Sequence, residues 1–440
     1  MNYHECLEYL EQVQILGIKF GLDNVRTVLS QFNDPHLKYS SVLVGGTNGK
    51  GSVCAMLARI LTLSGYQTGL YTSPHLIHVK ERIRIGEEDI SQKDFCLCVS
   101  YLREKITELI TSGRLSSHPT YFETLTCLAF LYYQKKNIDI AVLEVGMGGR
   151  FDATNVVTPL LSVITTISPE HQEFLGSTIE EISYEKAGII KIGKPVISGV
   201  EIENARNIIQ ERASSLKSDV KEVFSPPHTF SAKKTPDRYT FEFHTDKDKY
   251  VYSPSLPGLH QGKNAAMAIT VSEELSRIWR PIKKETMIQG IESTLWEGRL
   301  EKISQSPLIV LDGAHNIEGA EALKKYIEDF LPSPLTLVFA AKRDKKIIEI
   351  AEILFPCAEK IILTRFPFRK AAHPEELLKI IPVVWYDRIS IEPDPMRAFA
   401  MSIKESANKD HEGCVLIAGS LFLVGEAKKF LKGVNREKQL

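Results

Sequence analysis

The residues with the clearest chemical potential form a glycine-rich segment, Gly46-Thr-Asn-Gly-Lys-Gly-Ser52. The glycines allow backbone N–H groups to converge on phosphate oxygens, and Lys50 adds a positive charge. The segment follows an apolar run and precedes apolar residues at helical spacing, so a helix N-terminus would also favour an anion. It departs from the standard Walker pattern, because Gly51 displaces the hydroxyl to Ser52. We predict a phosphate-binding loop, with an ordinary glycine-rich turn as the alternative.

The elements that must position this loop alternate between apolar runs and helical patterns. Strands are predicted at Ser41–Val44, Ile138–Val145, Leu160–Ile167 and Pro195–Ser198. Apolar runs separated by helices are typical of a parallel sheet covered on both faces. Tyr239–Phe243 and Tyr250–Tyr252 alternate around a charged turn, which predicts a small antiparallel hairpin. A helix is expected from about Gly262 to Trp279.

A second series of predicted strands follows Trp296-Glu-Gly-Arg299: Leu308–Leu311, Leu335–Ala340, Lys360–Leu363, Val383–Trp385 and Cys414–Ala418. These strands indicate a smaller, Rossmann-like α/β domain. We therefore predict an α/β protein with a phosphate-loop domain over residues 1–295 and a C-terminal domain over residues 296–440. A cleft between two such domains commonly holds a small molecule.

Polar residues near predicted strand ends each have a structural alternative. Glu144 ends a strand, where open α/β sheets place ligands, and its carboxylate suits magnesium or the cap of a neighbouring helix. His171 by itself is more typical of a surface loop. The sequence around Lys186 is typical of a lysine on a helix face that pairs with Glu185 or Glu181.

The remaining candidates are equally open to two interpretations. Asn264 could contact an adenine edge or a phosphate, and Arg299 could clamp phosphates or form an interdomain salt bridge. Asp312 and His315 follow a strand, where they could bind a ligand or cap the helix near Ile317. The pair Tyr121 and Phe122 could stack on a flat heterocycle or pack in the core.

Further blocks in fixed order make the chain resemble the folylpolyglutamate synthase/dihydrofolate synthase family of the Mur ligase superfamily. Besides the loop, they are Tyr71-Thr-Ser-Pro-His-Leu76, Glu81-Arg-Ile83, Leu143-Glu-Val-Gly-Met-Gly-Gly-Arg-Phe-Asp-Ala-Thr-Asn155, His171, Glu185-Lys-Ala-Gly-Ile-Ile190, Pro257-Gly-Leu-His-Gln261, Asn264, Trp296-Glu-Gly-Arg299, Asp312-Gly-Ala-His-Asn316 and Gly419-Ser-Leu-Phe422. The resemblance implies an ATP- and Mg²⁺-dependent ligase of folate and one-carbon metabolism. Its expected reaction joins L-glutamate to dihydropteroate, to the glutamyl tail of a folate, or to both, through an acyl phosphate.

The resemblance also assigns roles to individual residues. Magnesium ligands fall on Ser73, Glu144 and His171, and Lys186 is expected to be carboxylated on its side-chain nitrogen (N6-carboxylysine). Lys50, Lys186 and His315 are the expected catalytic residues. ATP contacts fall on Thr47, Asn48, Gly49, Lys50, Gly51, Ser52, Asn264, Arg299 and Asp312. The substrate-binding segments fall on Lys19, Phe20, Gly21, Thr120, Tyr121, Phe122, Glu123, Phe151, Asp152 and Ala153.

The sequence departs from the family pattern at three places. Glu170 precedes His171 where relatives typically carry Asp, and Phe422 stands where some relatives have Tyr. Asp344-Lys345-Lys346 approximates the family's Asp-Lys-Asp, with the last acidic residue missing.

Composition excludes several function classes. The 54 Lys and Arg residues nearly balance the 55 Asp and Glu residues, which argues against a nucleic-acid surface. The longest apolar run, Leu125 to Tyr133, is too short to cross a membrane, and the polar N-terminus is unlike a signal peptide. Seven scattered cysteines favour a reducing compartment. We expect a cytoplasmic monomer that acts on small molecules.

Two other functions stay open from the sequence. A phosphate loop also serves ATPase switches that act on a protein partner, and a Mur-type ligase could act on a UDP-sugar peptide. The strand-end cluster at Asp312 favours a ligase over a switch. Gly51 and the Thr72-Ser-Pro-His75 segment favour the folate-type ligase over the UDP-sugar type.

Overall fold

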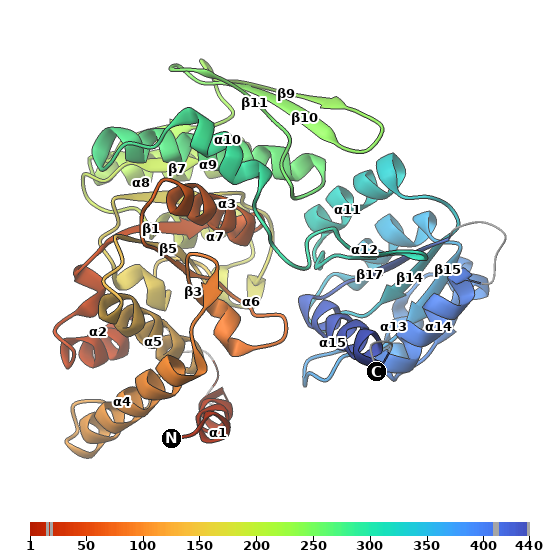
Figure 1. Cartoon of the computed structure of the whole chain (residues 1–440), viewed down its shortest axis with the longest axis horizontal. Helices are drawn as coiled ribbons and strands as arrows, with labels where there is room; N and C mark the ends of the chain where they lie inside the picture. The colour runs from red at the N-terminus through yellow and green to blue at the C-terminus, as the bar shows by residue number, and fades with distance from the viewer. Residues whose placement is uncertain (15–16, 18–20, 408–412, 438–440) are drawn as a thin grey trace.

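A computed structural model of the 440-residue chain describes residues 1–14, 17, 21–407 and 413–437. The described residues form two lobes, with the larger built from the first part of the chain and the smaller from the last part (Figure 1). This two-domain α/β arrangement confirms the predicted fold class.

The larger lobe is organised around a mostly parallel sheet with the order β4-β3-β2-β5-β1-β6-β7-β8. Only the pairs β2–β3 and β3–β4 are antiparallel among these strands. Their bounds are Ser40–Gly45 (β1), Thr68–Tyr71 (β2), Ile83–Ile85 (β3), Glu88–Asp89 (β4), Ile140–Glu144 (β5), Leu161–Ile164 (β6), Val196–Ser198 (β7) and Val220–Glu222 (β8).

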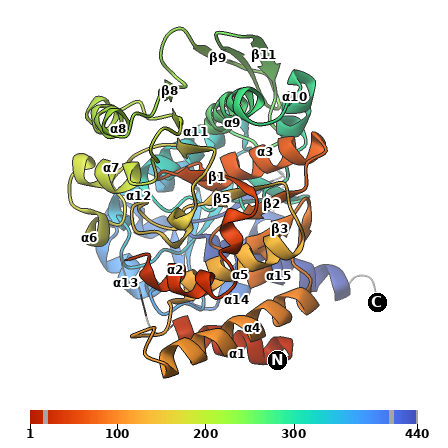
Figure 2. The ribbon, with the colours of Figure 1, turned by 90° about the vertical axis from the view of Figure 1, so that its left-hand side faces the viewer.

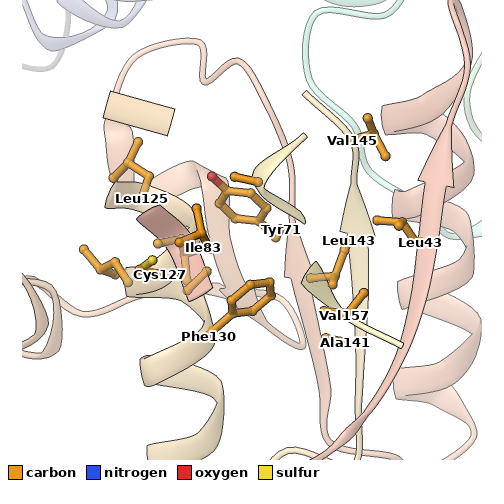
Figure 3. Close-up of a cluster of buried hydrophobic side chains, with 14 of the residues drawn as sticks. Leu43, Tyr71, Ile83, Leu125, Cys127, Phe130, Ala141, Leu143, Val145 and Val157 are labelled. Atoms are coloured by element: carbon orange, nitrogen blue, oxygen red, sulfur yellow. The ribbon is translucent and has the colours of Figure 1, made fainter. Parts of the chain in front are cut away.

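Alternate residues of the central strands face opposite layers of helices, because successive side chains of a strand point to opposite faces. Val42 and Val44 pack towards α3 (Lys50–Leu63) and α9 (Leu259–Ile278). Leu43 packs with Tyr71 and Phe130 on the other face, which α5 (Tyr121–Lys135) covers (Figure 3). Figure 2 shows α3 and α9 on one side of β1, β2 and β5, and α2 and α5 on the other.

Further helices complete the larger lobe. They are α1 (Tyr3–Gln14), α2 (Asp23–Ser30), α4 (Gln92–Thr111), α6 (Gln172–Leu175), α7 (Ile179–Ala187), α8 (Glu203–Ser215) and α10 (Lys284–Glu292). Short 3₁₀ turns occur at Pro35–Leu37, Val79–Arg82 and Ala153–Val156. α9 confirms the helix predicted near Gly262–Trp279.

The predicted hairpin exists and gains a third strand. β9 (Thr229–Lys234), β10 (Tyr239–His244) and β11 (Lys249–Tyr252) form a separate antiparallel sheet. This sheet reaches over to α11 (Ile317–Phe330) of the smaller lobe (Figure 1). Asp329, near the end of α11, pairs with Lys234 at 2.7 Å and accepts a hydrogen bond from Tyr239.

The smaller lobe holds a second sheet with the order β12-β13-β17-β14-β15-β16, parallel except for β12. Its strands are Glu301–Gln305 (β12), Leu308–Leu311 (β13), Leu335–Phe339 (β14), Lys360–Leu363 (β15), Ile389–Ile391 (β16) and Cys414–Ala418 (β17). Its helices, besides α11, are Ile347–Leu354 (α12), Pro374–Ile380 (α13), Pro395–Ala407 (α14) and Leu421–Glu437 (α15), with a 3₁₀ turn at Phe355–Cys357. Apolar clusters fill both faces of the sheet.

The strand predicted at Val383–Trp385 is wrong. These residues begin a 3₁₀ turn, Val383–Arg388, and the edge strand β16 follows it. Val383 and Val384 are 74% and 73% exposed, so their β-branched side chains have no sheet face to pack against. The predicted domain boundary near residue 295 falls between α10 and β12 and stays a prediction.

Two findings concern the chain's environment. Among the described residues, no helix is long and apolar enough to cross a membrane. All seven cysteines are described and free, as expected from their scattered positions.

Candidate functional site

The glycine-rich segment forms the connection between β1 and α3. Gly46 and Gly49 have φ angles of 134° and 84°, in the left-handed region that favours glycine. A Cβ atom on Gly49 would lie 2.5 Å from Oδ1 of Asn264, so this buried amide from α9 closes directly against the loop. The structure thus brings Asn264 to the loop, as the resemblance implies.

Two lysines converge on one carbonyl of this loop. Nζ of Lys50 donates to the carbonyl oxygens of Gly46 and Thr47 at 3.0 and 2.8 Å, and Nζ of Lys186 donates to Gly46 at 2.8 Å. Burial, assisted by the charge of Lys50, lowers the pKa of Lys186 to about 7. The salt-bridge alternative for Lys186 is wrong, since Glu185 pairs with Arg150 and the Glu181 carboxylate accepts from the backbone N–H groups of Ser177 and Thr178.

Glu144 lies at the end of β5 with 5% of its surface exposed. One of its carboxylate oxygens accepts a hydrogen bond from the backbone N–H of Ser73 at 2.8 Å, so Glu144 does not act as a helix cap. Burial raises the pKa of Glu144, while Lys50 and Arg299 act in the opposite direction. These cations show that Glu144 faces the loop and the second lobe.

His171 occupies the left-handed region with a φ of 54° and precedes α6. Burial lowers its pKa to about 4, so the imidazole is neutral at physiological pH and keeps a lone pair available. His171 and Ser73 line the same cavity. Within the described residues, His, Cys, Asp and Glu side chains form no cluster of three or more that could hold a metal.

The strand-end cluster of the smaller lobe follows β13. Asp312 is 7% exposed and accepts hydrogen bonds from the backbone N–H groups of Leu300 and Ala314 at 2.9 and 2.8 Å. Burial raises its pKa. Asn316, not Asp312 or His315, caps α11 by accepting from the N–H of Gly319.

Arg299 approaches the phosphate-binding loop from the smaller lobe. Together with Gly51, Ser73 and Glu144 it lines a small cavity of about 40 Å³. The structure therefore brings Arg299, from the start of the second lobe, to residues of the first lobe. No ion pair of Arg299 occurs among the described residues, so its guanidinium stays available for an anion.

Polar contacts made by Glu170 and by Asn48 cross the interface beside the loop. Glu170 pairs with Lys345 at 2.8 Å and with Nε2 of His315 at 3.2 Å, although only 11% of the Glu170 side chain and 10% of the Lys345 side chain are exposed. The Asn48 side chain donates from Nδ2 to Glu318 at 2.6 Å. The first of these contacts orients His315 towards the larger lobe.

A cavity of about 470 Å³ lies between the lobes. Its first-lobe wall includes seven of the predicted substrate residues: Thr120, Tyr121, Phe122, Glu123, Phe151, Asp152 and Ala153. Its second-lobe wall includes His315, Lys342, Lys345, Ser420 and Phe422. A volume of this size accommodates a small organic molecule.

Several of these wall residues also have local structural roles. Thr120 and Glu123 form a reciprocal capping box at the start of α5. Asp152 accepts from the backbone N–H groups of Gly146 and Met147 at 3.0 Å and so shapes the loop after β5. Lys19 and Phe20 lie outside the described residues, and Gly21 does not line the cavity.

The predicted site lacked several wall residues, among them Arg82, Lys342 and Phe422. Arg82 lies over the ring of Tyr121 at 5.4 Å, and Lys342 and Phe422 face the cavity from the second lobe. The carboxyl ends of parallel strands meet at one edge of a sheet, and Lys342 and Phe422 each follow such a strand closely. This rule, applied to β14 and β17, is the signal that could have found them.

The fold and the loop define a protein of the Mur ligase type, and known families agree. Residues 44–272 match the model of the Mur ligase middle domain. Residues 299–430 match the model described as "Dihydrofolate synthetase, C-terminal domain". The chain belongs to the dihydrofolate synthase/folylpolyglutamate synthase family.

Individual relatives cover nearly the whole chain. The dihydrofolate synthase/folylpolyglutamate synthase of Bacillus subtilis is 34% identical over 98% of this chain and 99% of its own length. The folylpolyglutamate synthase structure from Thermotoga maritima has a TM-score of 0.83 at 32% identity, covering 98% of this chain and 96% of that chain. The structure of E. coli FolC in complex with DHPP and ADP has a TM-score of 0.86 at 26% identity, covering 99% of both chains.

Proposed function

We propose that this chain is an ATP- and Mg²⁺-dependent ligase that joins L-glutamate to dihydropteroate, to the glutamyl tail of a folate, or to both. One observation carries the proposal. Asn48 of the phosphate-binding loop hydrogen-bonds Asn316 and Glu318 just after the strand-end cluster of the second lobe, and His315 of that cluster lines a cavity of about 470 Å³. The aromatic residues Tyr121, Phe122 and Phe151 line its first-lobe side, and His315, Lys342 and Lys345 line its second-lobe side.

The reaction consists of two transfers. A carboxylate oxygen of the pteroyl substrate attacks the γ-phosphorus of ATP, the bond to the β-phosphate oxygen breaks, and ADP leaves. The amine of glutamate then attacks the acyl carbon of the resulting acyl phosphate. An amide forms, the amine loses a proton, and inorganic phosphate leaves with the oxygen that belonged to the carboxylate.

The protein contributes position and charge to both steps. Among the described residues, the ammonium of Lys50 bonds only neutral carbonyl groups, so it can turn to the phosphates. Arg299 would neutralise the transferred group from the second lobe, and His315 lies close to it. Asn264 and Asp312 would hold the nucleotide, together with Thr47, Asn48, Gly49, Gly51 and Ser52.

Glu144, Ser73 and His171 are the residues we assign to Mg²⁺. Glu144 offers hard oxygen ligands at a strand end, and the lack of a larger ligand cluster among the described residues fits an ion that takes phosphate and water oxygens as well. Bound there, the ion would neutralise negative charge on the phosphoryl oxygens.

Lys186 is the residue we assign as N6-carboxylysine. Carboxylation needs a neutral amine, and the lowered pKa of Lys186 provides a substantial neutral fraction near pH 7. Intact-mass analysis and ¹³C NMR after incubation with labelled bicarbonate would detect the carbamate. A K186R variant that acquires the same signal would contradict the assignment.

The decisive experiment offers the purified protein ATP, Mg²⁺ and glutamate, with dihydropteroate and tetrahydrofolate supplied separately. Mass spectrometry should detect a product one glutamyl unit heavier, and ¹⁸O in the substrate carboxylate should appear in released phosphate. No glutamylated product from either substrate would overturn the proposal.

The same assay separates the two other functions. Phosphate release that ignores both the pteroyl substrate and glutamate would indicate an ATPase switch. Turnover of a UDP-sugar peptide would indicate the other type of Mur ligase. The names of the relatives favour the folate-type ligase, for which we propose a cytoplasmic monomer, testable by size-exclusion chromatography with light scattering.

A further inference from the structure

The second-lobe wall of the cavity carries an unusual cation, Lys342. It follows β14, and its Nζ lies 4.8 Å from the ring centroid of Phe422 and 5.1 Å from that of Phe368. These two rings stack on each other with centroids 4.6 Å apart. The side chain is half-buried, and its position over the rings fixes the ammonium at the cavity wall.

Lys342 differs from its neighbour Lys345 in its pairing. Lys345 is neutralised by Glu170 at 2.8 Å. In the part of the chain that the structure describes, Lys342 has no ion pair or hydrogen bond from its ammonium. Burial lowers the pKa of Lys342, with Asp344 acting in the opposite direction, which is consistent with a cation that lacks a close anion. A half-buried ammonium on a cavity wall gains most from an anionic ligand.

The position of Lys342 restricts which anionic ligand its ammonium can bind. His315 and Lys345 share the carboxylate of Glu170, whereas Lys342 lies on the same cavity wall beside Phe422. Lys342 lines the cavity of about 470 Å³, whereas none of the phosphate-loop residues 46–52, all of them described, lines it. The phosphates of the nucleotide are therefore not its partner.

We infer that Lys342 binds the side-chain carboxylate of the incoming glutamate and so determines the acidic specificity of the enzyme. The amine and the α-carboxylate of glutamate share one carbon, so both must lie at the acyl carbon beside His315. The side-chain carboxylate extends away from that carbon, towards a second cation. This inference rests on the proposed ligase function.

The test compares wild type with K342M, which keeps an unbranched side chain one atom shorter and removes its charge. We expect the KM for glutamate to rise about 10- to 100-fold, as expected for loss of a charge-assisted hydrogen bond, with the KM for ATP unchanged. The preference for glutamate over glutamine should fall by a similar factor, which a purely structural defect would not produce. K342R should restore most of both.

The control variant changes Lys370, a neighbouring exposed lysine, in the same way. K370M removes an exposed lysine nearby and should leave every KM unchanged. An unchanged KM for glutamate in K342M overturns the inference, and so does a rise only in the KM for a triglutamylated folate, which would assign Lys342 to the tail. If K342M does not fold, K342Q tests the same loss of charge. A wild-type protein without ligase activity would instead refute the proposed function.

Discussion

The phosphate-binding loop and the strand-end cluster after β13 lie on opposite sides of one cleft, yet they are built differently. The loop takes its shape from its own backbone, with glycines in left-handed conformations and lysines that bond carbonyl groups of the same lobe. In the cluster after β13, His315 is held by Glu170, which belongs to the other lobe. The backbone of the loop is therefore shaped within its own lobe, whereas the imidazole of His315 has one partner in its own lobe, Gly313, and one in the other, Glu170.

The largest loss of activity is expected from a change in the phosphate-binding loop. K50A should lower kcat about 10²- to 10³-fold, because no other group of the loop can replace an ammonium aimed at the phosphates. Steady-state kinetics with ATP and either pteroyl substrate measures this loss. The exposed Lys38 supplies a matched control, since K38A should retain wild-type activity. A K50A variant with more than about a tenth of wild-type activity would remove the loop from the chemistry.

Changes to Glu170, which joins the two lobes, are expected to cause an intermediate loss of kcat/KM. The size of this loss should depend on whether Lys345 is present. E170Q should lower kcat/KM about 10- to 100-fold, because it uncouples Lys345 and His315 from the first lobe. In a K345M background the same change should cost much less, since residues in one network are not additive. E170D, one methylene shorter, should lie between wild type and E170Q. Additive effects of E170Q and K345M would show that the two residues act separately.

A smaller effect is expected where the two regions touch directly. E318A removes the shorter of the two hydrogen bonds that the Asn48 amide donates, leaves its contacts with Asn316, and should raise the KM for ATP about fivefold, the equivalent of one modest hydrogen bond. E321A changes an exposed glutamate one turn further along α11 and is the control. Equal KM values for the two variants would mean that the hydrogen bond between Asn48 and Glu318 does not contribute to nucleotide binding.

The smallest expected effect concerns stability far from the cleft. Burial acts to raise the pKa of Asp329, but hydrogen bonds from Lys234, Tyr239 and Lys325 outweigh it and lower the pKa to about 2 from 3.8. A carboxyl group with a depressed folded-state pKa adds stability above its unfolded pKa, and that stability disappears as the pH falls from about 4 to about 2. Thermal unfolding of wild type and D329N should therefore converge over this window. A difference that persists at the lowest pH would contradict the ion-pair explanation.

The same contrast explains what the sequence could predict. The loop, its flanking strand and helix, and the parallel core follow from local patterns, so Lys50 and Glu144 were placed correctly at strand ends. Val383–Trp385 was misassigned because β-branched residues suggest a strand, while exposure on the edge of the sheet decided otherwise.

Contacts between residues far apart in the chain left no such pattern. Glu170 lies 145 residues before His315 and 175 before Lys345, and only the meeting of the lobes brings them together. The sequence shows that Glu170 is one methylene longer than the Asp typical of the family. It does not show that the Glu170 carboxylate reaches the other lobe. The same holds for Lys342, whose unpaired state depends on which neighbouring lysine Glu170 neutralises.

One helix connects remote parts of the molecule. α11 touches the phosphate-binding loop with its first turn, through Glu318, and the three-stranded sheet with its last turn, through Asp329 (Figure 1). A helix of this length is a stiff rod of about 20 Å, so its two ends cannot shift independently. A molecule bound to the three-stranded sheet would therefore be coupled through α11 to the phosphate-binding loop. Such a molecule would be expected to slow nucleotide turnover without entering the cleft.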